Sequence, residues 1–586
     1  MGQRKRTKSS LNSRRRWKSL TRLSKQLNQT FKKLLIAAIA LLALSVPAYA
    51  VEEICGDGID NDAAGGDLPC PSPDADHDGY TTDGTGLGYD CDDNSMFMPA
   101  QPWTRDGCSG LQAKKCNTAT GAYGSCTTPT EGSTNYYIDA TSGSDANPCS
   151  FASPCLSFLK FSQYITASPP GGYIDLAAGR TVWVFNGTLD ETYTDGALTR
   201  PSLYTRRSGS AGNPIRIWAP LSSNAPSAII DPAACDGTPM CPAMALIGNS
   251  YVDVRGFKIQ GGYHDGTVDV EGAGVASDGD NHTFAGNWIT NNEGPNSSNP
   301  CGMNISNAPT GWSITQNRLN DNYDRTAGVN ENERQICLFS GTGNDISYNV
   351  VYNTALYTDA DNAAGCIVWK HGQDAASNTI TNNRLWNCYQ TGIGSGNSGT
   401  TISRNLILDS DRGIFLQNFG GSTYVKNNVV EYNTIKSNKG FFEHNPEISG
   451  GTNAVNTFRY NVYQSSDAAY GNEDSVFTIW TYSDAAGWTT AHTGGFISIN
   501  NNCYYNSSAT ALSFCLSCAD GGLGGNYSLT SWRALSPAYD TTSVNANPTL
   551  DNYHRSTANC TSWGWLQTSG GGGGGTGAHL ITYEDY

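Results

Sequence analysis

A short pattern that returns eight times between Phe284 and Tyr504 constrains the fold of this chain more than any other feature. It consists of an apolar residue, two variable residues, an Asn, one variable residue and a second apolar residue. The asparagines stand 30, 32, 34, 22, 28, 28 and 41 residues apart, at Asn287, Asn317, Asn349, Asn383, Asn405, Asn433, Asn461 and Asn502. A repeat of about 20 to 50 residues with insertions of variable length indicates a solenoid.

The residues within and between the copies indicate the kind of solenoid. Each copy carries β-branched or aromatic residues at alternating positions, which favours a short strand. The segments between copies consist of turn formers, and residues 394–400, for example, read GSGNSGT. A leucine-rich repeat also has a periodic Asn, but it needs a Leu-rich strand and a recurring helical arc. We therefore expect an all-β fold, a right-handed parallel β-helix. Its asparagines from Asn287 to Asn461 should point inward in one column and pass hydrogen bonds between rungs.

Residues 1–50 differ in composition from the rest of the chain. They hold 12 Lys and Arg and no Asp or Glu, then an apolar run over 34–44, then Ala48-Tyr49-Ala50. This order predicts a secretory signal peptide. An N-terminal membrane anchor is the alternative, although the apolar run is short for a membrane span. No other segment is apolar enough to span a membrane, so we expect a mature chain that is secreted or held at the cell surface.

Charge and cysteine content limit the partners and the compartment. Without residues 1–50 the chain keeps 24 Lys and Arg against 52 Asp and Glu, a formal charge of −28. Such a chain is not expected to bind nucleic acid through its phosphates. All 18 Cys follow the signal peptide, which predicts disulfides. The candidate pairs are Cys149 with Cys155, Cys235 with Cys241, and Cys366 with Cys388; Cys515 and Cys518 form either a structural disulfide or a redox or metal pair.

Residues 51–130 are rich in Cys and Asp and are expected to form a separate module. Carboxylates at alternate positions of a loop, with a Gly for the turn, place several hard oxygens around one cation and favour Ca²⁺. A solvated acidic linker is the alternative. The expected ligands are Asp74, Asp76, Asp78, the Tyr80 carbonyl, Asp90, and Asp92 or Asp93, with a second group at Asp57, Asp60 and Asp62.

These two acidic stretches resemble the Asp-rich putative metal-binding repeats of secreted bacterial proteins, the type named after MopE and akin to thrombospondin type 3 repeats. Residues 74–80 and 90–93 match the second run of that pattern completely. The first run, over 55–62, departs from it at Ala63-Ala64, where further acidic residues are common. The resemblance implies a calcium-binding module at the N-terminus of the mature chain.

A second resemblance covers roughly residues 135–560. Residues 136–219 resemble the opening of secreted β-helix proteins of the pectate-lyase-like superfamily, in which a helix caps the first rung; residues 156–165 have the length and apolar spacing for that helix. Residues 528–532, 540–543 and 547–548 resemble the last rungs of such proteins. Residues 561–586 then form a Gly-rich tail. The resemblance implies a fold that grips polysaccharides along one face.

The densest candidate for chemistry is the stretch 367–372, which reads IVWKHG. β-Elimination of a uronate needs a base and a cation that holds the carboxylate. Lys370 is the candidate base, His371 a candidate for proton transfer, and Arg404 and Arg412 candidates for holding the carboxylate. The layout resembles the Lys-plus-Arg arrangement of the chondroitinase-B and alginate lyase family, but Gly365-Cys366 replaces its Glu-containing calcium motif. Alternatively, these cations are solvated strand ends paired with Asp.

Two functions follow from these patterns. The first is an exported protein that binds or processes a polysaccharide, expected to be anionic, with uronate β-elimination as the specific reaction. The second is a non-catalytic, calcium-stabilised scaffold or adhesin of the cell surface or matrix. The charge of −28 favours the second, because an anionic polymer is repelled unless Ca²⁺ bridges it. The three cations Lys370, Arg404 and Arg412 in a Lys-poor chain favour the first.

Overall fold

The computed structural model describes residues 74–565 with gaps. Short gaps lie at 83, 85–86, 93, 191, 196–197, 202, 206, 224, 389 and 551–553, and longer ones at 162–171, 233–240, 264–273, 293–300, 323–333, 355–364, 371–375, 418–424, 445–455, 466–474, 481–496, 507–512, 517–525 and 535–539. The expected signal peptide, the acidic run over 55–62 and the end of the tail therefore lie outside the described residues. The chain divides into two compact units, and every described residue belongs to the second.

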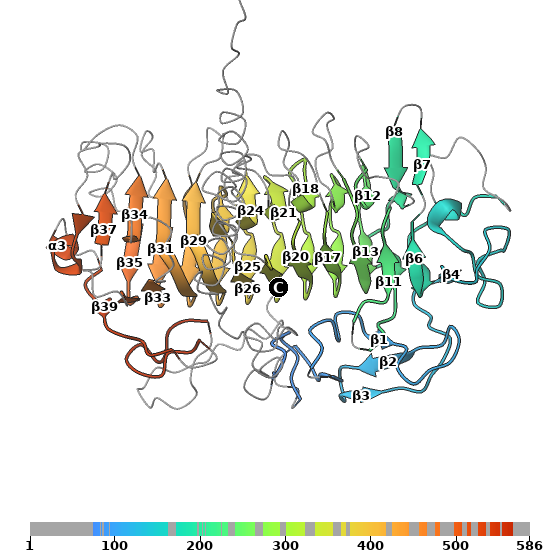
Figure 1. Ribbon diagram of the computed structural model, residues 1–586, viewed down its shortest axis with the longest axis horizontal. Coiled ribbons are helices and arrows are strands. Elements are labelled where there is room, and N and C mark those ends of the chain that lie inside the picture. The colour runs from blue at the N-terminus through green and yellow to red at the C-terminus, as the bar shows by residue number, and fades with distance from the viewer. Residues whose placement is uncertain are drawn as a thin grey trace, which may run out of the picture. The chain divides into compact units, whose positions relative to one another are not determined.

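Two long ladders of parallel strands contain most of the strands among the described residues (Figure 1). The first, face A, has twelve strands: β4 (Thr134–Asp139), β5 (Arg180–Phe185), β10 (Ile215–Trp218), β13 (Val252–Arg255), β16 (Thr283–Ala285), β19 (Ser313–Thr315), β22 (Asp345–Ser347), β25 (Thr379–Thr381), β28 (Thr401–Ser403), β30 (Val429–Glu431), β32 (Asn456–Arg459) and β35 (Ile497–Asn500). Each strand pairs in parallel with the strand of the next rung, as β19 does with β22.

The second ladder has 22 strands and folds into two further faces. Face B contains β6 (Gly187–Leu189), β11 (Ala228–Ile230), β14 (Phe257–Ile259), β17 (Trp288–Thr290), β20 (Arg318–Asn320), β23 (Val350–Tyr352), β26 (Arg384–Trp386), β33 (Val462–Ser465), β36 (Cys503–Tyr505) and β39 (Val544–Asn545). Face C contains β9 (Tyr204–Thr205), β12 (Met244–Leu246), β15 (Val275–Ser277), β18 (Cys301–Ile305), β21 (Arg334–Phe339), β24 (Gly365–Lys370), β27 (Thr391–Ser395), β34 (Ser475–Trp480), β37 (Ser513–Leu516) and β38 (Asn526–Tyr527). The long strands β29 (Leu406–Gln417) and β31 (Thr434–His444) run through both faces.

Each turn of the chain thus contributes one strand to each face, which is a parallel β-helix. Inward residues stack from rung to rung: Ile314, Ile346, Ile380 and Ile402 are in register on face A and completely buried. Because a period of two sends alternate residues to opposite sides of a strand, the residues between them point away from this core. The expectation of an all-β, right-handed parallel β-helix is confirmed.

The predicted asparagine column is confirmed. Each asparagine of the column from Asn287 to Asn461 is completely buried, and its Nδ2 donates to the Oδ1 of the next column member at 2.9–3.1 Å. The same Oδ1 also accepts the backbone N–H of the preceding Asn, as Asn405 does from Asn383 at 3.0 Å. Asn502 continues the column, and its backbone N–H donates to the Ser543 hydroxyl at 2.8 Å.

The residue before each of these asparagines has a left-handed backbone, which makes the corner between faces A and B a two-residue turn. We name these positions the corner row: Gly286, Gln316, Tyr348, Asn382, Arg404, Tyr432, Tyr460 and Asn501, with φ between 53° and 64°. A left-handed backbone is uncommon for residues other than Gly and Asn. It repeats on eight successive rungs, each time beside a bonded Asn, so the turn and the asparagine column occur together.

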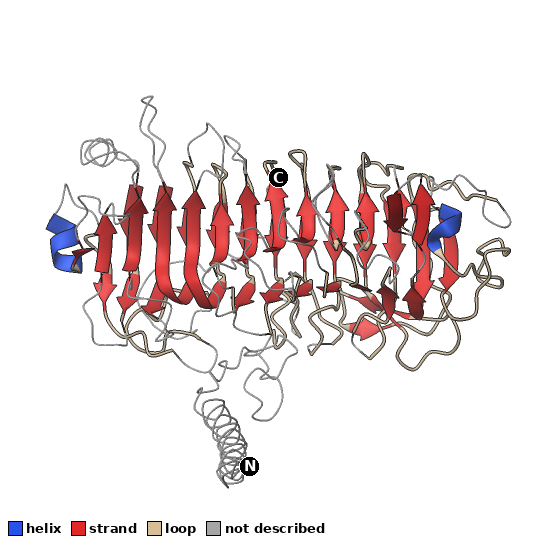
Figure 2. Cartoon of the chain, turned by 45° about the horizontal axis from the view of Figure 1, so that its top comes forward, coloured by secondary structure: helices blue, strands red, loops and turns tan. Residues whose placement is uncertain are grey.

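Short helices lie at opposite ends of the ladders (Figure 2). The capping helix predicted over 156–165 is a 3₁₀ helix, η1 (Phe158–Phe161), with Phe158 and Phe161 buried in the core; residues 162–165 lie outside the described ones. At the other end, α3 (Leu529–Ala534) stacks Trp532 on Phe514 with ring centres 5.3 Å apart. No helix among the described residues has the length and apolarity that a membrane span requires.

Disulfides join neighbouring rungs and fix the ends. Two of the three candidate pairs are confirmed, Cys149 with Cys155 and Cys366 with Cys388. Cys241 is disulfide-bonded, but Cys235 lies outside the described residues, as does Cys518. The other described pairs are Cys91–Cys116, Cys108–Cys126, Cys301–Cys337 and Cys503–Cys560.

Replacing one member of the asparagine column should weaken the solenoid locally. Asn405→Ala removes the acceptor of two Asn383 donors and the donor to Asn433, and buried groups left without partners are costly. We expect a loss of about 2–4 kcal/mol in urea unfolding. Faster hydrogen exchange should be confined to the adjacent rungs, because solenoid contacts are nearest-neighbour. Thr381→Ala on the same face should stay within about 0.5 kcal/mol of the wild type, and equal effects of the two changes would contradict the prediction.

The C-terminal end of the solenoid should become less stable as the pH rises. Asp540 is completely buried beside Tyr504, and burial raises the pKa of its carboxyl to about 7, against the lowering effect of Ser543, Tyr504 and Arg533. The folded state therefore holds this proton more tightly than the unfolded chain, so stability should fall between about pH 4 and 7 and level off above. Asp540→Asn should flatten the pH profile of thermal unfolding, because Asn tolerates the left-handed φ of 53° at this position. An exposed acid replaced as a control, Asp175→Asn, should leave the slope unchanged.

Candidate functional site

The segment 74–130 packs against the β-helix. Its small antiparallel sheet comprises β1 (Trp103–Thr104), β2 (Lys114–Asn117) and β3 (Ala122–Tyr123); a separate hairpin, β7 (Thr192–Asp195) with β8 (Leu198–Pro201), belongs to the early rungs. Trp103 meets Trp183 of β5 edge to face at 5.5 Å, and the Arg255 guanidinium donates to the Ala100 carbonyl at 2.6 Å. The segment thus packs directly on the β-helix and is not merely joined to it by a linker.

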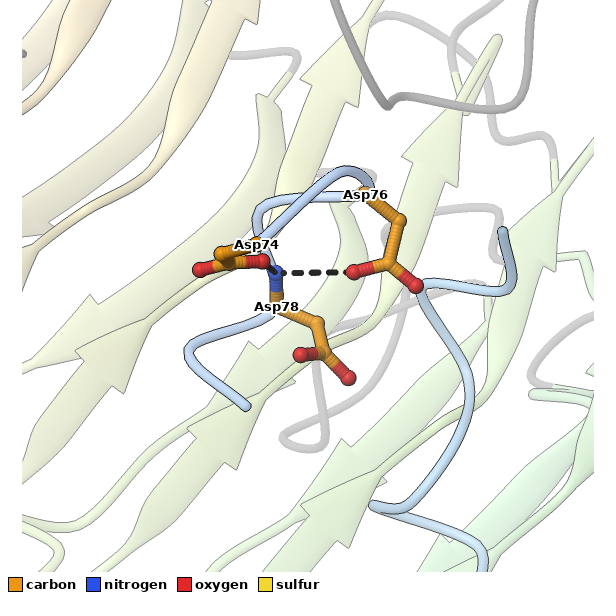
Figure 3. A group of neighbouring side chains, drawn as sticks. All are labelled: Asp74, Asp76 and Asp78. Carbon is orange, nitrogen blue, oxygen red and sulfur yellow. Dashed lines mark hydrogen bonds between the residues drawn. The ribbon is translucent and has the colours of Figure 1, made fainter. Parts of the chain in front are cut away.

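Three of the predicted metal ligands converge in the acidic loop of this segment (Figure 3). Asp74, Asp76 and Asp78 each offer a carboxylate oxygen within 4.8 Å of the others. The backbone N–H of Asp78 donates to Asp74 Oδ1 at 3.1 Å and to Asp76 Oδ1 at 3.3 Å, which folds the loop around its own carboxylates. Asp76 and Asp78 are 2% and 0% exposed, so this loop is not a solvated linker.

The β-helix holds this loop through the corner row. The side-chain amide of Gln316 donates to both the carbonyl and the Oδ2 of Asp78 at 2.9 Å. On the next rung, Tyr348 covers Gly79 so closely that a Cβ there would lie 2.7 Å from Tyr348 Cζ. The φ of 93° at Gly79 is a second reason why only glycine fits.

Negative charge is crowded in the loop. Burial raises the pKa of the Asp78 carboxyl well above its ordinary value, and the charges of Asp76, Asp74 and Asp90 raise it further. Burial lowers the pKa of His77 to about 3, and the positive charge of Arg384 contributes to this lowering. His77 is therefore neutral, and its 3.9 Å approach to Asp74 is not an ion pair that could offset this charge.

A divalent cation fits these residues. Oxygens bound to one Ca²⁺ at about 2.3–2.6 Å lie within roughly 5 Å of one another, which the three carboxylates satisfy. A cation would also remove the repulsion that acts on Asp78. The Asp triad can therefore hold a metal ion.

The other predicted ligands are less directly placed. Asp90 is 6% exposed, and its negative charge is close enough to raise the pKa of Asp78. Its Oδ1 accepts the N–H of Asp92. Tyr80 donates its N–H to Asp78 Oδ1 at 2.8 Å. Asp57, Asp60, Asp62 and Asp93 lie outside the described residues.

Of the predicted catalytic residues, Lys370 lies two rungs before Arg404 and Arg412, which share one rung. Lys370 ends β24 on face C, is 8% exposed and has its amine 5.8 Å from the centre of the Phe339 ring. Arg404 belongs to the corner row, with its guanidinium 5.7 Å from the Tyr432 ring. Arg412 lies within β29 and contacts Asp411 at 3.7 Å. His371 is outside the described residues.

The strand register separates Lys370 from Arg412. Trp369 aligns with Ser395, and Ser395 with Leu416, so the position level with Lys370 on β29 is Gln417. Gln417 lies five residues beyond Arg412, about 16 Å along the strand. The two cations are therefore not placed to act on one sugar at the same time.

A row of basic side chains at the start of face C was not predicted from the sequence. Arg412 aligns with Thr391 on one side and Lys439 on the other, and both cations lie 3.7 Å from Asp411. Arg334 donates to the Gln390 side chain at 2.9 Å, and the Gln390 carbonyl accepts the N–H of Arg412. No sequence signal joins Arg334 to Lys439, because 105 residues and three rungs separate them.

The corner-row contacts to the acidic loop were also missed. Gln316 and Tyr348 precede repeat asparagines, so their positions were readable from the sequence as turn residues. Nothing in the sequence shows that a segment more than 230 residues earlier packs there.

Of the aromatic side chains near Lys370, Trp369, Trp386 and Phe415 are buried, at 0%, 2% and 4% exposure.

Comparison with solved structures finds proteins of low similarity. Pectate lyase Pel9A is 16% identical over 57% of this chain and 76% of its own, with a TM-score of 0.39. XylC in complex with xylose is 12% identical over 66% and 86%, with a TM-score of 0.35. An alginate lyase from a Paenibacillus species is 14% identical over 63% and 95%, with a TM-score of 0.31. No protein-family model matches the chain, and no curated protein matches it in sequence. The assignment of a β-helix rests on the strand register, and no chemistry follows from these likenesses.

Proposed function

We propose that this protein is secreted and binds an anionic polysaccharide along face C, where it cleaves uronates by β-elimination. The observation that carries the proposal is the position of Lys370 at the end of β24, largely buried and facing outward beside the Phe339 ring. An amine with little water around it, next to an aromatic surface on which a sugar can stack, combines a base with a binding platform.

In this mechanism Lys370 takes the proton alpha to the uronate carboxylate. The resulting electron pair forms a double bond as the glycosidic oxygen departs, and that oxygen gains a proton. A positive charge near the carboxylate stabilises the enolate-like transition state. The register places Arg412 and Lys439 too far along the strands for that role at the same sugar, so their role in this proposal is to bind carboxylates of other uronates along the polymer. Arg334 is 4% exposed and supports the Gln390 side chain instead.

The separation of these cations is also the observation that favours the alternative. A scaffold or adhesin needs no convergent base and cation, and it accounts for the formal charge of −28 and for the acidic segment fixed on the solenoid. In that case the basic row binds acidic groups without breaking a bond.

We further propose that the metal held by Asp74, Asp76 and Asp78 is Ca²⁺, with Asp90 and Asp92 as further ligands. All the donors are carboxylate oxygens, which suit a hard cation better than zinc or copper. Export through a signal peptide is supported by the described disulfides, since disulfides persist in oxidising compartments.

A lyase should release unsaturated uronates, which are detected by their ultraviolet absorbance, from alginate, pectate or a chondroitin-like polymer. Lys370→Ala should lower the initial rate by about 10²-fold or more, because a positioned base is lost. Lys370→Arg should not restore activity, as the two cations differ in shape and acidity. Lys258→Ala is the matched control, a lysine over the Trp288 ring on face B. If the wild type yields no unsaturated product with or without Ca²⁺, the scaffold function is favoured instead.

Calcium should stabilise the segment around the acidic loop more than the solenoid. In calorimetry, chelation should lower the temperature of one transition and leave the β-helix transition in place, because solenoid stability is local. Asp76→Asn should abolish this response, whereas Glu131→Gln, which alters an acid one residue beyond the segment and ion-paired with its Lys115, should preserve it. Thermograms that are identical with Ca²⁺ and with chelator would contradict the assignment.

A further inference from the structure

The C-terminal segment 554–565 folds back along the β-helix to the acidic loop. The Cys503–Cys560 disulfide anchors it to β36. Gly564 then donates its N–H to the carbonyl of Tyr460 in the corner row at 3.0 Å. The N–H of Trp565 donates to the Thr434 hydroxyl at 3.1 Å. In Figure 1 this segment and the acidic loop lie on the same side of the ladders.

The two ends of the described chain meet through one pair of rings. His77 packs edge to face on Trp565, with ring centres 4.7 Å apart and an interplanar angle of 74°. Both side chains are buried, at 7% and 3% exposure. His77 also lies 6.2 Å from the Tyr348 ring, so the contact is formed over the corner row. Residues 488 positions apart in the sequence thus share one interface.

The position of His77 in the loop links this contact to the metal site. His77 stands between Asp76 and Asp78, and its φ of 54° is left-handed. The direction of its ring is therefore set by the same backbone that brings the three carboxylates together. Repulsion among Asp74, Asp76, Asp78 and Asp90 opposes the closed loop, and a cation bound between the carboxylates would offset it. An open loop does not hold His77 against Trp565.

We propose that metal binding by the acidic loop and docking of the segment 554–565 are thermodynamically coupled. The loop and the segment form a clasp over the corner row, which the cation closes. This inference rests on the proposed metal site and adds to it a defined response at the other end of the chain. Coupling of this kind is reciprocal, so a docked segment must raise the affinity for the cation by the same factor as the cation favours docking.

Glycine at position 564 shows that the docking is tight. Its φ is 93°, and a Cβ there would lie 2.5 Å from the Thr434 hydroxyl. Trp563, two residues before Trp565, lies instead over Tyr460 at 6.4 Å between ring centres. The segment therefore places one Trp on the loop and a second one on the corner row.

The test measures Ca²⁺ affinity by titration calorimetry on the full mature chain. Trp565→Ala should weaken Ca²⁺ binding about 2- to 12-fold, the range expected for one edge-to-face aromatic pair. His77→Ala should do the same, and the double variant should lose little more, because both changes remove one contact. Lys258→Ala, a change on face B outside the clasp, should bind Ca²⁺ as the wild type does. Trp565→Phe, which keeps an aromatic ring, should retain most of the affinity.

A second measurement needs no substitution. In the wild type, Ca²⁺ should slow hydrogen exchange in residues 554–565 as well as in the acidic loop, and chelation should reverse both effects. If Trp565→Ala binds Ca²⁺ with the affinity of the wild type, the coupling is contradicted and the metal site is not. The same conclusion follows if Ca²⁺ binds to the wild type without changing hydrogen exchange in residues 554–565. A wild type that binds no Ca²⁺ would overturn both.

Discussion

The column of asparagine amides is the interaction on which the rest of this structure depends. A buried amide is costly unless its donors and acceptor are bonded, and here each Asn is bonded to its counterparts above and below. A shift of one residue on any rung would break two of these links and turn the apolar side chains outward. The column therefore fixes the register, while insertions of different length are accommodated between copies.

Because the register is fixed, so is every surface built on it. The left-handed residue before each Asn projects from the corner between faces A and B, and it forms the row on which the acidic loop and the C-terminal segment pack. Gln316 bonds Asp78, Tyr348 covers Gly79, and Tyr460 accepts from Gly564. One structural constraint thus yields a docking surface for two segments from opposite ends of the sequence.

The same register limits the chemistry. Lys370 and Arg412 are close in sequence, but strand geometry places them at different levels of face C. The register instead aligns Arg412 with Lys439, and Gln390 connects Arg412 to Arg334, which forms a basic row. A reaction that needs a base and a cation at one sugar must therefore draw the cation from outside this row.

The sequence by itself determined the features that depend on local periodicity. The β-helix, the Asn column and the Asp74–Asp78 cluster were all predicted, because each is a short pattern whose spacing directly sets its geometry. The disulfide between Cys366 and Cys388 was predicted for the same reason, as the two residues are one rung apart. Only the tertiary structure decided which surfaces meet. A second asparagine column, through Asn292 and Asn322 to Gln335, was missed although its asparagines keep the 30-residue spacing of the repeat. The docking of the acidic loop on Gln316 and the contact of His77 with Trp565 join residues whose separation in sequence carries no signal. Solenoid insertions vary in length, so the level at which distant side chains meet is set by strand register and packing rather than by spacing along the chain.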